Sequence, residues 1–296
     1  MSNASIPEGA VLVGVENWPA AAESVSWAAE QAFRDGHDLC LLHVVTGATL
    51  DTPPGFRAGA PSELDQDHGA VVLATASRYA DRRLDELSRA PEFLGFRRPE
   101  VRVDLQVGPV ASVLDAASSV ASLLVLGSRG RGPISSRILG SVSRSALVDA
   151  RCPVVVLRPG TGGLGRGVLV GIDGTSDSIP ALEFAFAQAA QRSLPITVLY
   201  CYRSGGADRP DDDRVLVAES VAGLRERYPD LHPRLRIEAG SLAHTLSEQS
   251  PTMHMVVAGS SGTGVAKYLL DHAHGVVAVI PPALSRADTS PPTAAV

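Results

Sequence analysis

The sequence lacks the features of a secreted, membrane-embedded or nucleic-acid-binding protein. Only three cysteines occur in 296 residues, and Cys40, Cys152 and Cys201 show neither a CxxC pair nor metal-ligand spacing, which favours a reducing, cytoplasmic setting. No apolar run is long enough to cross a bilayer, and residues 1–9 lack the basic and apolar segments of a signal peptide. The net charge is −6 and Lys267 is the only lysine, so no basic stripe collects the charge that nucleic acid requires. We therefore expect a cytoplasmic protein with no membrane partner and no nucleic-acid partner.

Two signatures of phosphate chemistry are also missing. The P-loop pattern Gly-x4-Gly-Lys-Ser/Thr does not occur, and no carboxylate–histidine pair has a convincing catalytic spacing. Any bound phosphate must therefore be held by backbone amides, hydroxyl groups and arginines. We do not expect an enzyme.

What the sequence does contain is an internal repeat. Residues 11–16 (VLVGVE) match residues 168–173 (VLVGID) at an offset of 157, and the match holds without a gap as far as His43 and Tyr200. Each copy predicts a strand, an amphipathic helix and a second strand, the last over residues 39–45 and 196–202. The positions at helical spacing are Val25, Ala28, Ala29 and Ala32 in the first copy and Leu182, Ala185, Phe186 and Ala189 in the second.

Later landmarks repeat at shorter offsets. The apolar run before Gly127 matches the run before Gly259, and each copy ends on an apolar strand, at residues 154–157 and 276–280. Apolar strands that alternate with helices indicate parallel sheets with helices on both faces. We expect two tandem doubly wound α/β domains of five strands each.

The boundary between the copies is predicted in the glycine-rich segment 159–165. The first domain then spans residues 1–159 and the second spans residues 160–296. The tail from residue 283 to residue 296 is rich in Pro, Ala, Ser and Thr and is predicted to be disordered.

The most informative segment follows the fourth apolar strand of the first copy. It has the pattern Gly-x2-Gly-x9-Gly-Ser, in which glycines let backbone N–H groups approach an anion and the serine caps a helix whose dipole favours negative charge. The residues expected to form this loop are Gly127, Arg129, Gly130, Gly140, Ser141, Val142 and Ser143. Arg129 and Arg131 add positive charge, although both could equally be surface arginines.

This pattern resembles the ATP-binding signature of the universal stress protein family. The opening strand VLVGVE, the His43-Val44-Val45 end of the second strand, Gly108-Pro109 before a helix and Cys152-Pro153 before the last strand resemble the same family. The resemblance covers nearly the whole chain in two copies. It implies a strand order of 3-2-1-4-5, with a nucleotide across the ends of strands one and four, where the strand order reverses.

The resemblance also implies a set of contacts. The glycines of the loop, together with Ser141, Val142 and Ser143, match the positions that contact phosphate, and Val44 matches the position whose backbone meets the adenine. Glu16 stands where the family usually has Asp. Its carboxylate could still accept a hydrogen bond from a ribose hydroxyl or hold Mg²⁺ beside ATP, or Glu16 could be a solvated residue at a strand end.

The second copy keeps Asp173 but loses the rest of the site. The offset between the copies is 132 at Gly127 and Gly259 and 123 at Cys152 and Gly275, so nine residues are missing between the glycine turn and the last strand. The helix-capping Gly-Ser lies within that gap. We expect a degenerate second copy and one nucleotide per chain, in the first half.

The resemblance implies an ATP-binding protein that acts in stress-response signalling or regulation. Two alternatives remain open, a weak ATP hydrolase and a nucleotide-free interaction module. The last strands of the copies are expected to pair within the chain, as in the dimers of single-domain relatives, and a homodimer is possible. His43 is expected to be structural, and the pair His272 and His274 is not expected to hold a metal.

Overall fold

The computed structural model describes residues 6–46, 62–127, 150–158, 165–202, 210–261 and 264–282. The elements of the first half are, in chain order, β1 (Val11–Gly14), α1 (Ala22–Asp35), β2 (Leu39–Val45), α2 (Glu63–Leu87), a 3-10 turn (Pro91–Phe93), β3 (Val101–Val107), α3 (Val110–Ser118), β4 (Leu123–Gly127) and β5 (Val154–Leu157). Those of the second half are β6 (Val168–Ile172), a 3-10 turn (Ser176–Ser178), α5 (Ile179–Gln191), β7 (Ile196–Tyr202), α6 (Pro210–Arg227), β8 (Arg234–Ala239), α7 (Leu242–Gln249), a 3-10 turn (Ser250–Thr252), β9 (Met255–Gly259), α8 (Val265–His272) and β10 (Val277–Ile280). The predicted linker and tail lie outside the described residues, apart from the last residue of the linker.

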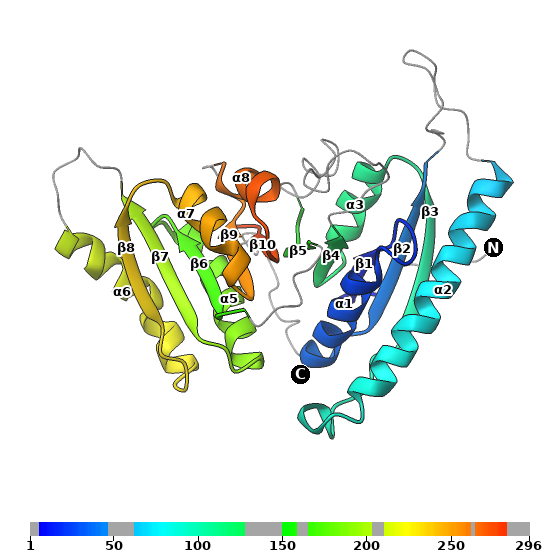
Figure 1. The fold of residues 1–296 in the computed structure, drawn as a ribbon, viewed down its shortest axis with the longest axis horizontal. Coiled ribbons are helices and arrows are strands. Elements are labelled where there is room, and N and C mark those ends of the chain that lie inside the picture. The colour runs from blue at the N-terminus through cyan, green and yellow to red at the C-terminus, as the bar shows by residue number, and fades with distance from the viewer. Residues whose placement is uncertain are drawn as a thin grey trace, which may run out of the picture.

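The strands form one continuous sheet of ten strands in the order β3-β2-β1-β4-β5-β10-β9-β6-β7-β8 (Figure 1). Within each half the strands are parallel and their order is the predicted 3-2-1-4-5. The α/β fold predicted from the sequence is therefore confirmed. The two sheets are not separate, however, because their last strands join edge to edge.

The junction between the halves is the antiparallel pair β5–β10. Val155 lies opposite Ala278, and Val154 and Val156 lie opposite Val279 and Val277. These residues occupy equivalent places in the two copies, so the pairing is symmetric about a point beside Val155. The predicted pairing of the last strands within the chain is confirmed.

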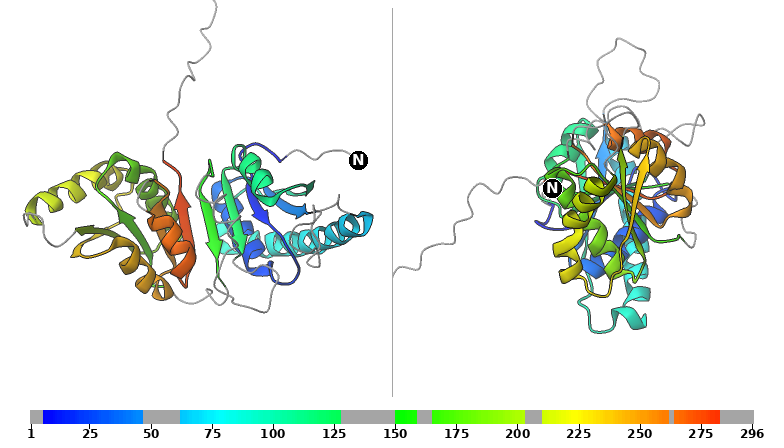
Figure 2. Two further views of the ribbon diagram at one scale, coloured as in Figure 1. Left: turned by 90° about the horizontal axis from the view of Figure 1, so that it is seen from above. Right: turned by 90° about the vertical axis from the view of Figure 1, so that its left-hand side faces the viewer.

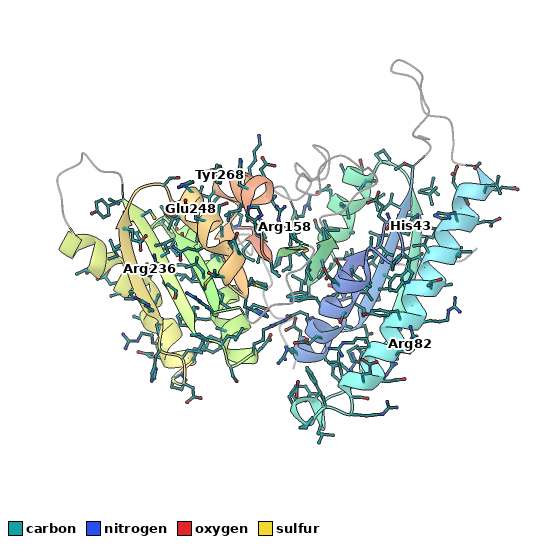
Figure 3. All side chains as sticks on the ribbon, in the orientation of Figure 1. His43, Arg82, Arg158, Arg236, Glu248 and Tyr268 are labelled. Atoms are coloured by element: carbon teal, nitrogen blue, oxygen red, sulfur yellow. The ribbon has the colours of Figure 1, made fainter. Side chains whose placement is uncertain are left out.

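Arg158, directly after β5, ties the first half to a helix of the second (Figure 3). Its side chain is buried, and its Nη2 donates to the carbonyl oxygens of Leu270 at 2.5 Å and Leu269 at 3.4 Å, near the end of α8. The Leu269 carbonyl also accepts from the Ala273 amide, but carbonyls in the last turn of a helix generally lack an intrahelical donor and carry negative partial charge, so a guanidinium is well suited to this place.

Helices cover both faces of the sheet (Figure 2). One core lies under α1, α2, α5 and α6, and the other lies under α3, α7 and α8. The eight residues predicted to form the buried faces of the first helices are all 0% exposed, which confirms the helical pattern; they are Val25, Ala28, Ala29, Ala32, Leu182, Ala185, Phe186 and Ala189.

Local signals fix the helix ends. Ser62 and Asp65 form a capping box at the start of α2, in which the Ser62 hydroxyl accepts from the Asp65 amide at 3.2 Å. Gly36 ends α1 in the left-handed conformation, with φ of 70°. Within the described ranges, no helix is long and apolar enough to span a membrane.

Candidate functional site

The fold brings three of the predicted site residues to one edge of the sheet. Glu16 follows β1 and is exposed, Val44 is half-buried near the end of β2, and Gly127 ends β4. β1 lies between β2 and β4, so these residues share the carboxyl ends of three adjacent strands. This is the point where the strand order reverses, the usual place for a ligand in an open α/β sheet. The remaining predicted residues, Arg129, Gly130, Gly140, Ser141, Val142 and Ser143, lie outside the described residues.

Gly127 is packed closely against the first turns of α1. A Cβ on Gly127 would lie 3.0 Å from the Oγ of Ser24, which is 2% exposed. A Cβ here would force the Ser24 hydroxyl to shift by a few tenths of an ångström, so glycine lets the backbone of β4 approach the helix without that shift. Ser24 was not among the site residues predicted from the sequence; its place next to Val25, on the predicted buried side of a helix, indicates burial but not the contact with Gly127.

His43 supports the chain just before Glu16 (Figure 3). Its ring is buried, and its Nδ1 lies 2.7 Å from the carbonyl oxygen of Val15. A carbonyl can only accept, so Nδ1 carries the proton and donates. Gly69 of α2 lies directly against the ring, because a Cβ there would be 2.8 Å from the His43 Cδ2. These contacts agree with the structural role expected for His43.

The segment after Glu16 is also anchored to α2. The ring of Trp18 packs on Tyr79 with centroids 5.0 Å apart. The Val15 amide donates to the carbonyl of Leu42 at 2.8 Å, which extends the pairing of β1 and β2 beyond β1 itself. Glu16 is therefore carried by a fixed segment.

In the second half, the equivalent carboxylate is that of Asp173, and it stabilises the turn that follows β6. Asp173 Oδ1 accepts from the amide of Thr175 at 3.0 Å and from the hydroxyls of Thr175 and Ser178, each at 2.7 Å. Burial alone would raise the pKa of Asp173, but these hydrogen bonds together lower it below its ordinary value. Asp173 thus closes the connection between β6 and α5.

The backbone next to Asp173 is covered by a side chain. Gly174 has φ of 80°, and a Cβ on it would lie 2.4 Å from the Cδ2 of Leu216 in α6. At the end of β9, by contrast, Gly259 has only ordinary contacts, at 3.7 Å or more. Helix α8 begins after Gly264 without a side-chain cap. The helix that follows β9 therefore lacks the serine-capped start that is predicted after the glycine turn of the first half.

The thiols and histidines offer no alternative centre in the described part of the chain. Burial raises the pKa of Cys40 and of Cys152 to about 12, so both thiols are protonated at neutral pH. His272 stacks on Tyr268, and its Nδ1 donates to the Tyr268 carbonyl at 2.9 Å. No group of three or more His, Cys, Asp or Glu side chains within the described ranges could hold a metal ion.

Comparison with known proteins agrees with this arrangement. The sequence model described as "Universal stress protein family" matches residues 9–158 and again residues 166–281. The chain belongs to the universal stress protein family. Its two copies are two tandem universal stress domains.

Relatives with the same tandem organisation match along most of their length. A universal stress protein of Mycobacterium tuberculosis is 30% identical over 274 residues, which cover 86% of this chain and 87% of that protein. One of Mycolicibacterium smegmatis is 29% identical over 272 residues, which cover 88% and 90%. Among solved structures, a universal stress protein of Archaeoglobus fulgidus superposes with a TM-score of 0.64 at 16% identity and covers 92% of this chain and 96% of its own. The last similarity shows the shared fold.

Proposed function

We propose that this universal stress protein binds an adenine nucleotide, ATP, in its first half only. The first domain would span residues 1–159 and the second, residues 160–296, would be a structural partner without a ligand. Other universal stress proteins have been solved in complex with dAMP and with cAMP. The proposal for this chain rests on its own residues.

The observation that carries the proposal is the difference between the two halves at the same edge of the sheet. In the second half, Asp173 is engaged by three hydrogen bonds and Gly174 is covered by Leu216. The carboxylates of Glu16 and Asp173 are both exposed, but only the first half carries the full glycine pattern, which begins at Gly127. Only the first half combines an exposed carboxylate with the residues for a phosphate loop.

The chain's own groups suit the chemistry of a nucleotide. The amides that follow Gly127 and Gly130, the Ser141 hydroxyl and the Arg129 guanidinium are donors for phosphate oxygens. Glu16 is the carboxylate placed to accept from a ribose hydroxyl or to hold Mg²⁺, which would supply charge neutralisation beside the phosphates. Val44 offers its backbone to the adenine.

We further propose that the nucleotide acts as a signal and is not turned over. Binding would order the surface formed by the loop after Gly127, and a partner in a cytoplasmic stress response would read that surface.

The test uses two matched glycine substitutions in the full chain. Gly130→Val should abolish ATP binding, because a β-branched side chain blocks the backbone's approach to phosphate. Gly262→Val, at the equivalent place in the second copy, should leave binding unchanged. Calorimetry with ATP and Mg²⁺ should give a site number near one for the natural chain and for the Gly262→Val variant.

Mass spectrometry of the ligand released from the purified chain separates the alternatives. A released adenine nucleotide supports the proposal, and a converted product would indicate an ATP hydrolase. A natural chain that carries no nucleotide and binds none would favour the nucleotide-free module. Two equivalent sites would show that both halves bind the nucleotide, and loss of binding in Gly262→Val alone would place the ligand in the second half; either result would overturn the proposal.

A further inference from the structure

A cluster of polar side chains lies buried where the two halves meet, between α1 and α5. Gln31 of α1 is 1% exposed and Gln188 of α5 is 3% exposed. These two glutamines are equivalent residues of the repeat, since 157 positions separate them. They lie on the same side of the sheet as Val155 and Ala278, the residues at the centre of the symmetric pair β5–β10. The cluster is therefore placed close to the axis that relates the halves.

Arg192, directly after α5, joins the two glutamines. Its Nη2 donates to Gln31 Oε1 at 2.7 Å, and its Nη1 donates to Gln188 Oε1 at 2.8 Å. The guanidinium also lies over the ring of Trp27, 5.4 Å from its centroid. Burial lowers the pKa of Arg192 to about 10, and the like charge of Arg34 also lowers it, while Glu30 and Asp35 of the first half favour the charged form. The side chain is thus a cation at neutral pH, held between the halves.

Asp35, the last residue of α1, supplies the opposite charge. Its carboxylate accepts from Gln31 Nε2 at 2.8 Å and from Gln191 Nε2, across the junction, at 2.9 Å. Arg34 donates to the carbonyl of Gln191 and also pairs with Glu30 at 2.9 Å. The first half therefore presents two acids and one arginine, and the second presents one arginine and neutral side chains.

Asp35 and Arg192 are themselves equivalent residues, because 157 positions separate them too. At the same place about the axis, one half carries a group that only accepts hydrogen bonds and the other carries a group that only donates them. Arg192 donates to the side-chain oxygens of Gln31 and Gln188, which Asp35 cannot do. Asp35 accepts from the side-chain nitrogens of Gln31 and Gln191, which Arg192 cannot do. This set of hydrogen bonds therefore requires one first half, with its aspartate, and one second half, with its arginine.

From this arrangement we infer that the α1–α5 contact is a recognition surface that pairs a first half with a second half and rejects pairing between like halves. Two first halves would bring two Asp35 carboxylates to the axis and would lack the Arg192 guanidinium that donates to the Gln31 oxygen, while Arg34 is held by Glu30. Two second halves would bring two Arg192 guanidinium groups together, with no carboxylate between them. Like charges in a partly desolvated contact repel strongly, and the unpaired amide groups add to the cost. The partner that fits α1 is therefore a helix with arginine where α1 has aspartate.

The intact chain can be made to imitate each rejected pair. Arg192→Asp gives the second half the charge of the first, and Asp35→Arg gives the first half the charge of the second. Each single variant should lower the melting temperature of the full chain by roughly 4–8 °C. The double variant Asp35→Arg/Arg192→Asp restores opposite charges in exchanged places and should recover at least half of the combined loss.

Two controls separate recognition from ordinary damage to the fold. Glu183→Arg reverses an exposed charge on α5 and should change the melting temperature by less than about 2 °C. Asp35→Asn removes the charge without reversing it and should cost less than Asp35→Arg. If a single variant does not fold, recovery of folded protein in the double variant is the equivalent readout. A double variant that loses the full sum of the two single losses, or that stays unfolded when a single variant does, would overturn the inference.

Discussion

The role of Asp173 can be tested by removing its carboxylate. The structure makes this residue an anchor of the β6–α5 connection, whereas its position in the repeat equals that of Glu16, at the proposed nucleotide site. Asp173→Ala should therefore destabilise the chain and leave ATP binding as it is. Asp177→Ala, in the same exposed turn, is the matched control.

The size of the effect follows from three hydrogen bonds to one charged acceptor. A buried bond of this kind contributes about 1.5–3 kcal/mol, but Asp173 is exposed, so solvent reduces each contribution to roughly 0.5–1 kcal/mol. The three together give about 2 kcal/mol, which corresponds to a fall in melting temperature of about 4–8 °C. The control should change it by less than about 1–2 °C.

The pH dependence of this contribution has a definite sign. The pKa of Asp173 is lowered in the folded chain, below its ordinary value of 3.8. The carboxylate therefore stabilises the fold at pH values above 3.8, and this stabilisation is lost as the pH falls through the folded pKa. The difference between the natural chain and Asp173→Ala should be constant from pH 5 to 8 and should shrink below about pH 4.

Thermal unfolding by circular dichroism and calorimetric titration with ATP together test the argument. An unchanged melting temperature in Asp173→Ala would show that the turn does not depend on the three hydrogen bonds. A tenfold or larger loss of ATP affinity in a folded variant would show that Asp173 contacts the nucleotide. Either result would refute the assignment of Asp173 to structure alone.

Two further outcomes are expected. Gly127→Ala should lower the free energy of unfolding, measured in urea, by about 1 kcal/mol, because the new Cβ would press on the Ser24 hydroxyl. Gly259→Ala meets only ordinary contacts and should lower it by less than about 0.5 kcal/mol. Equal losses in the two variants would contradict the close packing at Gly127. The pKa of His254 is lowered, first by burial and then by Arg192, so the unfolded chain takes up a proton before the folded one as the pH falls below 6.5. Stability should therefore fall from pH 6.5 towards pH 5 in the natural chain and less so in His254→Gln, and parallel profiles would exclude this role. The charged groups that face His254 are Arg192, Glu30 and Arg34.

Much of the fold could be predicted from the sequence because its signals are local. The buried faces of α1 and α5 repeat every three or four residues, and the apolar strands are short runs between turn residues. The offset of 157 residues also showed that both copies share these elements. The strand order came from the resemblance to a family, and the structure agrees with it.

The candidate site was only partly accessible to such reasoning. The pattern from Gly127 onward and the carboxylate of Glu16 could be read from the chain, as could the loss of nine residues in the second copy. The buried Ser24 could not, because only the tertiary structure brings its hydroxyl to Gly127. Nor could the sequence show that Asp173 is taken up by Thr175 and Ser178, since a carboxylate at a strand end can face inward or outward.

The sequence by itself determined that the chain has two α/β halves and that one of them carries the glycine pattern, because these properties depend on residue order within short segments. Only the tertiary structure decided that the halves form a single sheet and that Asp35 and Arg192 lie in one polar cluster at the junction, each hydrogen-bonded to Gln31. Arg192 meets Gln31, and Gln191 meets Arg34 and Asp35, because the pairing of β5 with β10 sets α1 beside α5. The charge at each position is visible in the sequence, but its partner is fixed by the geometry of that junction.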